Sequence, residues 1–282
     1  MSDAPQKPVT LNTLRRCKAD GRKFAALTCY DATTARWLAR AGVEVLLVGD
    51  TAAQMILGYE STIHAPMDFM VTITAAVKRG APDRFVMADM PFMSYQADDA
   101  EAIRNAGRFM TEGSADAVKL EVDAGFGDLV TKLSRAGVPV VAHIGSLPQR
   151  VRQTGGYRST GRTAAAGRRL VEEAELMTAC GASMLLIEAT AEEVSQRITE
   201  RVNIPVIGCG AGPACDGQVV VLQDLLGLSD WQPPFAPPAA QLGRQVQQAA
   251  SDWAQQVRSG DFPDGHHPYA MTEAERAIFT KS

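Results

Sequence analysis

The chain has 282 residues, of which 46% are hydrophobic and 21% are charged, a balance that excludes global disorder and supplies enough apolar side chains for a large core. A formal net charge of -4, with lysine and arginine in scattered pairs, excludes the basic surface of a nucleic-acid-binding protein. No apolar run approaches the roughly 20 residues that span a bilayer, so we expect no membrane association.

The predicted elements begin after a short polar arm, residues 1–10. This arm has no apolar run of the kind found in signal peptides, and the five cysteines form no Cys-x-x-Cys pair, so we expect a cytoplasmic protein without a disulfide framework or zinc knuckle. The run FAALTCYD (24–31) predicts the first strand, which Asp31 ends.

Six later stretches each combine a helix-like segment, a turn residue and a short apolar run. They cover residues 39–50, 78–89, 110–121, 134–145, 178–188 and 199–210. Such apolar runs are typical of buried parallel strands. Residues 218–228 supply an eighth strand and the start of a helix, so we predict an α/β fold, a single (β/α)8 TIM barrel over residues 1–282.

The turn residues between helix and strand are predicted to adopt a positive φ, which favours glycine. They are Gly42, Gly80, Gly113, Gly137 and Gly181, with Asn203 in the same place in the last stretch. Beyond the barrel, residues 231–240 read as a proline-rich connector. Residues 241–260 predict an amphipathic C-terminal helix, which we expect to pack on the barrel or on a neighbouring subunit, followed by a tail.

Two long loops interrupt this pattern. Residues 51–69 follow the second strand without clean periodicity and are a candidate substrate loop. Residues 149–161 carry three glycines and are a candidate lid. The sequence leaves open whether Gln54, His64 and Tyr157, which lie in these loops, contact the ligand.

Three carboxylates end three successive predicted strands: Asp50, Asp89 and Glu121. The carboxyl ends of barrel strands meet at one rim, where the active sites of TIM-barrel enzymes lie. Oxygen-only ligands suit Mg²⁺ or Mn²⁺ better than zinc. The alternative is that each acid caps the next helix, which is the better interpretation for any one acid alone. Three together favour a metal site.

Lys119, His143 and Glu188 end strands at the same predicted rim. Lys119 points to the same side as Glu121, because side chains alternate along a strand, and it either holds an oxygen of an anionic ligand or forms a structural pair. Glu188 is a candidate general base or a paired buried acid. His143 is a ligand, a hydrogen-bond donor to substrate, or a core histidine. The glycine cluster 208–212 lacks a phosphate-loop lysine and is interpreted as a tight turn.

Together these residues lie in a set of motifs that resembles the 3-methyl-2-oxobutanoate (ketopantoate) hydroxymethyltransferase family. The motifs are LLVGD, RGAPDRFVMADMPFMSY, AVKLE, HIG-x-x-PQ, GGY-x-x-x-GR, RIT-x-x-x-x-IPVIGCGAG and CDGQV-x-V-x-D, and they run from about Leu14 to the FPDGHH tail. The resemblance implies a TIM barrel of the phosphoenolpyruvate/pyruvate type, Mg²⁺ dependence and a large ring-based homo-oligomer such as a decamer.

The resemblance also implies a role for each rim residue. Asp50 and Asp89 would bind the metal directly, and Glu121 through water. Lys119, His143 and the hydroxyl of Thr51 would bind the 2-oxo acid, and Glu188 would be the acid/base. The implied reaction transfers a hydroxymethyl group from 5,10-methylenetetrahydrofolate to the C3 enolate of 3-methyl-2-oxobutanoate, giving 2-dehydropantoate for pantothenate biosynthesis.

The loop 51–66 departs from the family pattern. The family usually has Ser-Leu-Gly where this chain has Thr51, Ala52 and Ala53, and Thr-Leu-Pro-Val-Thr where it has residues 62–66. Beside this loop, a usual histidine is Ile73. The alternatives are therefore the same enolate chemistry on another 2-oxo acid or one-carbon donor, or a non-catalytic paralogue. Lyases and mutases of similar barrel are expected to carry a Lys-x-Cys-Gly-His loop, which this sequence lacks.

Overall fold

A closed barrel of eight parallel strands forms the centre of the computed structural model, which describes residues 7–263 and 269–281. The strands follow one another around the barrel in chain order, and β8 closes it by pairing with β1. They are β1 (Phe24–Thr28), β2 (Val45–Val48), β3 (Phe85–Asp89), β4 (Ala117–Glu121), β5 (Val140–Gly145), β6 (Met184–Glu188), β7 (Val206–Cys209) and β8 (Gly217–Val220). The predicted TIM barrel is confirmed.

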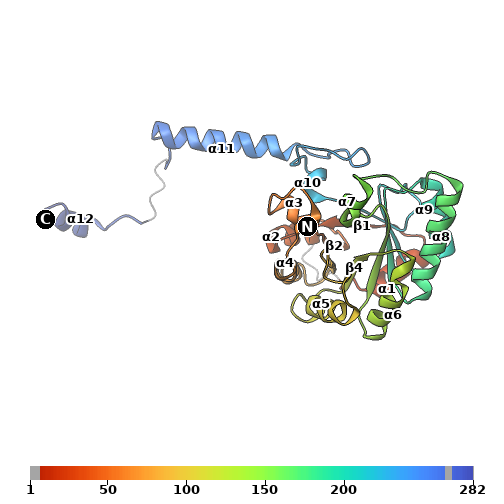
Figure 1. The fold of residues 1–282 in the computed structure, drawn as a ribbon. Coiled ribbons are helices and arrows are strands. Elements are labelled where there is room, and N and C mark those ends of the chain that lie inside the picture. The colour runs from red at the N-terminus through yellow and green to blue at the C-terminus, as the bar shows by residue number, and fades with distance from the viewer. Residues whose placement is uncertain (1–6, 264–268, 282) are drawn as a thin grey trace. The chain divides into compact units, whose positions relative to one another are not determined.

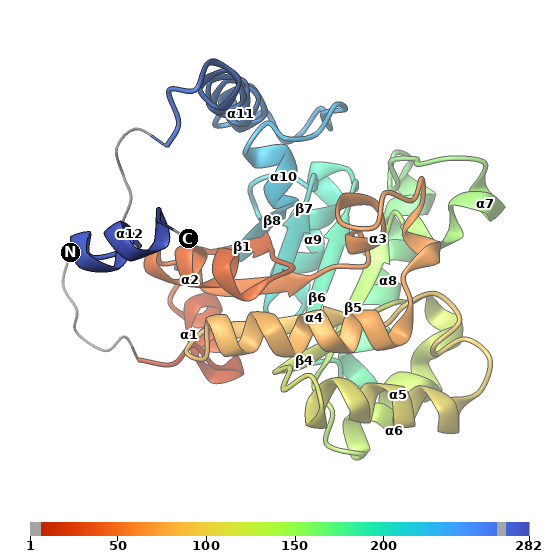
Figure 2. The same cartoon turned by 90° about the vertical axis from the view of Figure 1, so that its left-hand side faces the viewer.

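Helices surround this barrel (Figure 1). The helices that follow β1 to β6 are α2 (Ala32–Arg40), α4 (Met67–Gly80), α5 (Asp99–Thr111), α6 (Gly127–Arg135), α8 (Ala164–Ala179) and α9 (Glu192–Arg201). The remaining elements are α1 (Leu11–Ala19), before β1, and the short α3 (Ala52–Met55), η1 (Thr62–His64), η2 (Ala124–Phe126), η3 (Pro148–Arg150), α7 (Val151–Thr154) and α10 (Leu222–Leu225). Figure 2 shows α4, α5 and α6 following one another along one side of the sheet.

The chain divides into two compact units, Met1–Leu222 and Gln223–Ser282. The second contains α11 (Leu242–Ser259), which confirms the helix predicted over 241–260, and a further helix, α12 (Glu273–Phe279), which the sequence pattern did not predict. Most of the predicted arm, at residues 1–6, and part of the tail, at residues 264–268, lie outside the described residues. Within the described part of the chain, no helix is both long enough and apolar enough to cross a membrane.

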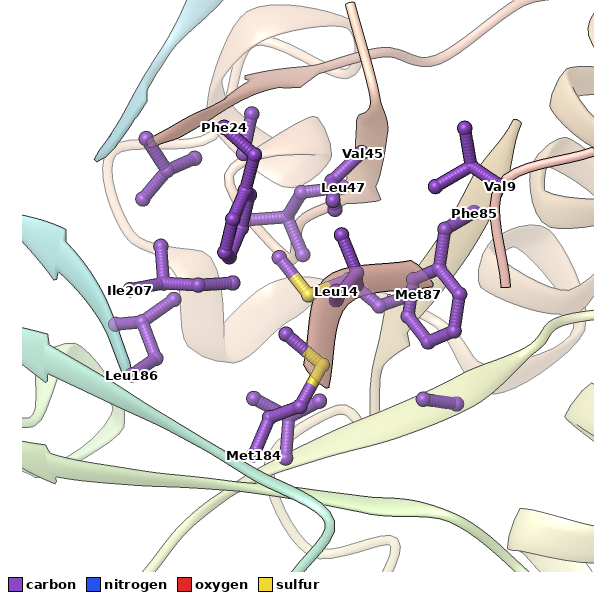
Figure 3. Close-up of a cluster of buried hydrophobic side chains, with 14 of the residues drawn as sticks. Val9, Leu14, Phe24, Val45, Leu47, Phe85, Met87, Met184, Leu186 and Ile207 are labelled. Carbon is purple, nitrogen blue, oxygen red and sulfur yellow. The ribbon is translucent and has the colours of Figure 1, made fainter. Parts of the chain in front are cut away.

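Apolar side chains fill the amino-terminal half of the barrel (Figure 3). The inward-facing first residues of several strands, among them Phe24, Val45 and Phe85, contact one another there. Leu14 and Val9, which precede β1, join the same cluster, so α1 covers this end of the barrel. This half of the barrel is therefore a packed core, and ligands must approach from the opposite end.

The same inward-facing rows become polar at the carboxyl ends of the strands. Because side chains alternate along a strand, the row that contains Met87 continues to Asp89, and the row that contains Leu186 continues to Glu188. Lys119 follows Ala117 in the same way. Strand periodicity thus carries the polar residues into the barrel mouth, directly above the apolar layers.

Some predictions of local structure were wrong. Gly42, Gly137 and Gly181 have the predicted positive φ, of 85°, 84° and 96°, but Gly80, Gly113 and Asn203 do not. Gly80 is the last residue of α4, and a Cβ there would overlap the backbone of Ala32 at the start of α2, so close helix packing requires this glycine. After Gly113 the positive φ belongs to Ser114.

The first strand is also shorter than predicted. It ends at Thr28, and Asp31 is the N-cap of α2, where its side chain accepts hydrogen bonds from the N–H groups of Thr33 and Thr34. A capping role therefore explains this acid, which takes no part in the polar rim.

Candidate active site

The structure brings the predicted rim residues together at the carboxyl ends of β2 to β6. In the strand register, Asp89 pairs with Lys119, and Glu121 pairs with His143. None of the three predicted metal-binding acids is a helix N-cap, because Thr51, Asp98 and Asp123 take those positions in the elements that follow. The alternative interpretation of Asp50, Asp89 and Glu121 as caps is therefore wrong.

Lys119 is the only cation in direct contact with these acids among the described residues. Its Nζ lies 2.9 Å from Asp89 Oδ1 and 3.2 Å from Nδ1 of His143. The other oxygen of Asp89, Oδ2, accepts a hydrogen bond of 3.0 Å from the backbone N–H of Asp50. All four side chains are buried.

Burial and crowding shift the pKa values of this cluster. Burial, opposed by Lys119 and assisted by Asp50, raises the pKa of Asp89 to about 7. Burial and then Asp50 raise the pKa of Glu121 well above its usual value. Burial alone would lower the pKa of Lys119, but Asp89, Asp50 and Glu121 together raise it. The shared cause is an excess of negative charge in a buried site.

The size of that excess suits a divalent cation. When ionised, the three carboxylates and the one ammonium leave two negative charges without a partner. Apart from its ion pair with Lys119, the buried Oδ1 of Asp89 accepts no hydrogen bond from the described residues. Among those residues, no three His, Cys, Asp or Glu side chains converge to ligate one ion. Mg²⁺ needs only one or two protein carboxylates, since water and substrate oxygens complete its shell.

Glu188 stands beside His143 at the end of β6. Its Oε2 lies 3.4 Å from Nε2 of His143, but the two atoms are not aligned for a hydrogen bond, and Nε2 has no other hydrogen-bond partner among the described residues. The Glu188 side chain is 22% exposed, so a ligand in the barrel mouth can reach it. Burial, and secondly the charge of Lys119, lower the pKa of His143, which favours a neutral imidazole.

The candidate substrate loop folds into α3 and η1 beside this cluster. The hydroxyl of Thr51 lies 2.6 Å from the buried hydroxyl of Tyr30. Gln54 and His64 make their contacts inside the loop: the Gln54 amide donates to the carbonyl of Glu60, and the His64 ring stacks on Tyr59. Among the described residues, no hydrogen bond or ion pair joins Gln54 or His64 to the carboxylates.

The candidate lid, residues 149–161, includes both an exposed and a buried residue. Tyr157 is 58% exposed, and burial, followed by the charges of Glu188, Asp50 and Glu121, raises its pKa. Gln149 at the start of this segment is instead buried among the carboxylates. The lid stays a prediction, and Gln149, its first residue, is held by hydrogen bonds to Asp50 and to the carbonyl of Met90.

Sequence reasoning missed three residues of the site: Tyr30, Tyr95 and Gln149. Tyr95 is 2% exposed, and its hydroxyl lies 2.9 Å from Gln149 Oε1. Tyr95 and Gln149 were within motifs that stood out in the sequence, MADMPFMSY and HIG-x-x-PQ, so the motifs marked them, but nothing in either pattern indicated where their side chains lie.

Comparisons with known proteins agree with this geometry. The family model described as ketopantoate hydroxymethyltransferase matches residues 8–265. The chain is 45% identical over 270 residues to 3-methyl-2-oxobutanoate hydroxymethyltransferase of Alkalilimnicola ehrlichii, covering 95% of this chain and 97% of the relative. It is 44% identical over 261 residues to the protein of the same name from Thermotoga maritima, covering 92% and 96%.

Solved structures match the fold at lower sequence identity. A phosphonopyruvate hydrolase in complex with oxalate and Mg²⁺ aligns with a TM-score of 0.62 at 12% identity, covering 96% of this chain and 95% of that one. A 2,3-dimethylmalate lyase of the phosphoenolpyruvate mutase/isocitrate lyase superfamily aligns with a TM-score of 0.59 at 17% identity, covering 98% and 99%. These likenesses agree with the fold, a closed barrel of eight parallel strands.

Proposed function

The chain belongs to the ketopantoate hydroxymethyltransferase family, and from that premise we propose that it transfers a hydroxymethyl group from 5,10-methylenetetrahydrofolate to C3 of 3-methyl-2-oxobutanoate, giving 2-dehydropantoate. One observation carries the proposal. Three carboxylates and one ammonium are buried together at the mouth of the barrel, beside a half-buried fourth acid, Glu188. When the three carboxylates are ionised, two of their negative charges have no cationic partner among the described residues. This arrangement provides for a divalent cation, an anionic substrate and a base.

Asp50 and Asp89 would hold Mg²⁺ or Mn²⁺ directly, with Glu121 bound through water. When bound, the ion supplies positive charge to the carboxylate and keto oxygens of a 2-oxo acid and so favours its enolate. The phosphonopyruvate hydrolase of similar fold was solved with oxalate and Mg²⁺, and oxalate carries the same two adjacent oxygen-bearing carbons as a 2-oxo acid. That likeness supports the choice of cation and substrate class.

Lys119, His143 and Thr51 would bind the 2-oxo acid. The ammonium of Lys119 is held in place by Asp89 on one side and His143 on the other, so it offers a fixed positive charge without reorganising. The hydroxyl of Thr51 is oriented by Tyr30. The apolar layers below the rim keep water from reaching the site from the amino end of the barrel.

Glu188 would remove the proton from C3 of the bound 2-oxo acid. The electron pair of that C–H bond becomes the enolate, which forms a C–C bond to the one-carbon unit of the folate as one of the two C–N bonds to that unit breaks. The second C–N bond breaks as the oxygen of one water bonds to the same carbon and becomes the new hydroxyl. The two folate nitrogens take up one proton from that water and, through solvent, one equivalent to the proton removed from C3. Glu188, which keeps contact with solvent, can then release its proton.

The alternative substrates rest on the divergent loop, and its packing favours the family substrate. Ala52 and Ala53, which replace the usual Leu and Gly, are completely buried. Their methyl groups therefore pack inside the protein and take no space from an open pocket. The non-catalytic alternative would leave two buried negative charges without a function, at a considerable cost in stability.

Proton exchange at C3 tests the proposal. The protein is incubated in deuterium oxide with 3-methyl-2-oxobutanoate and Mg²⁺, and the C3 proton is followed by NMR, with a parallel sample that contains tetrahydrofolate and a panel of other 2-oxo acids. We expect exchange that a chelator abolishes. Exchange only with a different acid would favour an enzyme that carries out the same enolate chemistry on another 2-oxo acid. No exchange with any acid would favour the non-catalytic paralogue.

We propose the remaining family properties in the same way. The chain would act in pantothenate biosynthesis in the cytoplasm and form a homo-oligomer such as a decamer. Light scattering coupled to size-exclusion chromatography measures the subunit number directly. A monomer at micromolar concentration would contradict this part of the proposal.

A further inference from the structure

Gln149, in η3 just after β5, contacts two acids of the cluster, donating from its side-chain amide to Asp50 and from its backbone N–H to the carboxylate of Glu121. It is 5% exposed. We propose that Gln149 is a positioning residue that fixes Asp50 and Glu121 in the arrangement that accepts the divalent cation. The inference rests on the proposed function in one respect, the binding of a cation by these acids.

Gln149 connects two acids that lie on different strands. Its backbone N–H lies 3.1 Å and 3.0 Å from the two carboxylate oxygens of Glu121, which ends β4. Its side-chain Nε2 donates to Asp50 Oδ2, after β2, at 2.9 Å and to the carbonyl of Met90, after β3, at 3.0 Å. One residue of the β5 segment therefore holds the ends of three other strands.

The partners of the Gln149 amide fix its orientation. Nε2 faces two groups that can only accept, the carboxylate of Asp50 and the carbonyl of Met90, and both of its hydrogens are used. Oε1 accepts from the amide of Gln96 at 3.0 Å and lies 2.9 Å from the Tyr95 hydroxyl. A flipped amide would set two oxygens against each other at Asp50, so this side chain has one arrangement.

Tyr95 connects the Gln149 amide to the backbone of Glu121. Its hydroxyl accepts a hydrogen bond of 3.1 Å from the Glu121 N–H and lies within donating distance of both the Glu121 carbonyl, at 3.0 Å, and Gln149 Oε1. Tyr95 is itself buried. The network thus reaches Glu121 by two routes, through the backbone of Gln149 and through Tyr95.

The network opposes the mutual repulsion of the acids. Without a cation, like charges favour rotation of Asp50 and Glu121 away from each other. The Gln149 side chain gives Asp50 a neutral donor that costs no additional buried charge. Partners of this kind, which orient metal-binding carboxylates, typically account for about 10–100-fold in metal affinity.

The test compares Gln149→Met with the wild-type protein by calorimetric titration of Mn²⁺ and Mg²⁺ into chelator-treated protein. Methionine has a similar length and no donor. We expect affinity for both ions to fall about 10-fold or more, and C3-proton exchange to recover as Mg²⁺ is raised, which a merely misfolded site would not do. Gln149→Leu, which also lacks the donor and adds no charge, should bind at least as weakly.

Two further variants serve as controls for the ion titrations. Gln153→Met, an exposed glutamine in α7, should bind the ions as the wild type does. Asp50→Asn should lose most of the affinity. Unchanged affinity in folded Gln149→Met would overturn the inference while leaving the proposed function intact, whereas a folded wild-type protein that binds neither ion would overturn both. If both Gln149 variants fail to fold, Tyr95→Phe decides: weaker binding supports the network, and unchanged binding refutes it.

Discussion

Lys119 Nζ lies 3.2 Å from Nδ1 of His143, and this contact determines where the imidazole carries its hydrogen. An ammonium can only donate, so Nδ1 accepts and is unprotonated. Burial and the charge of Lys119 lower the pKa of His143, so the ring is neutral and its hydrogen lies on Nε2. Nε2 faces Glu188 Oε2 at 3.4 Å. His143 therefore carries its hydrogen on the nitrogen nearer to Glu188, although the two atoms are not aligned for a hydrogen bond.

The first prediction concerns this tautomer. Nitrogen-15 NMR of labelled, metal-free protein should show His143 with hydrogen on Nε2, neutral below the ordinary histidine pKa of about 6.5. His143→Asn assigns the signal. Because its folded-state pKa is lowered, this group stabilises the fold above about pH 6.5 and loses that contribution as the pH falls. A His143 signal that titrates at or above pH 6.5 would contradict the assignment.

The second prediction compares the two members of the buried ion pair. Lys119→Gln leaves three acids without a cation, whereas Asp89→Asn leaves Lys119 near Asp50 and Glu121. Removing one partner of a buried pair typically costs about 3–5 kcal/mol. We expect Lys119→Gln to lower the free energy of unfolding of the metal-free protein by that amount at pH 8, and Asp89→Asn to lower it by less. Urea unfolding measures both.

The order of these two costs is the informative result. The double variant should be more stable than Lys119→Gln alone, because it removes one of the unpaired acids. If Asp89→Asn proves the more damaging substitution, then Lys119 is not neutralising the whole acidic cluster, and the charge argument for a divalent cation fails with it.

The third prediction concerns pH and metal removal. An acid whose folded-state pKa is raised holds more protons in the native state than in the unfolded chain between the two pKa values, so stability falls as the pH rises through that window. For Asp89 the window runs from about 4, its ordinary value, to about 7; Glu121 is shifted in the same direction. Metal-free protein should therefore lose stability over this range.

Added Mg²⁺ should reverse that loss. An ion that binds only the native state at 100 times its Kd stabilises it by about 2.7 kcal/mol. Thermal unfolding at pH 5 and pH 8, with chelator and with Mg²⁺, measures the effect. We expect the gain from Mg²⁺ to be larger at pH 8, where the acids are ionised. An equal gain at both values would mean that the ion binds elsewhere.

Strand periodicity made much of the site predictable from the sequence. Asp89 and Glu188 each end a short apolar run, Lys119 lies two residues before the end of β4, and alternation along parallel strands brings such residues to one rim whatever the sequence between them. The same rule placed His143 at this rim, where it is the register partner of Glu121. Alternation along the strands requires only a local pattern of apolar and polar residues and a barrel that closes.

The residues that were missed lie in irregular segments. Gln149 follows β5 by four residues, and Tyr95 follows β3 by six, so no period fixes where their side chains point. Their place depends on hydrogen bonds to partners about 100 and 26 positions away, Asp50 and Glu121. Gly80 was misassigned for a similar reason, since its role is a contact between α4 and α2 that neither helix shows alone.

The fourth prediction assigns the base. Glu188→Gln keeps the size of the side chain and the layer beneath it but cannot accept the C3 proton. Proton exchange should fall by about 10²–10⁴-fold, the usual contribution of a general base, while Mg²⁺ affinity is retained. Glu193→Gln, an exposed acid in α9, is the matched control and should exchange as the wild type does. Exchange at the wild-type rate in Glu188→Gln would exclude this residue as the base.

The last prediction concerns the Thr51 hydroxyl, which is 2.6 Å from the hydroxyl of buried Tyr30. If Tyr30 orients this group toward the 2-oxo acid, Tyr30→Phe leaves the hydroxyl free to rotate, and the substrate loses about one hydrogen bond, roughly 1 kcal/mol. The KM for the 2-oxo acid should then rise about 5-fold with a smaller change in kcat. Thr51→Val, which removes the hydroxyl, should raise KM at least as much, and the two substitutions together should add little, because both act through one group. An unchanged KM in Tyr30→Phe beside a raised KM in Thr51→Val would mean that Thr51 binds the substrate without help from Tyr30.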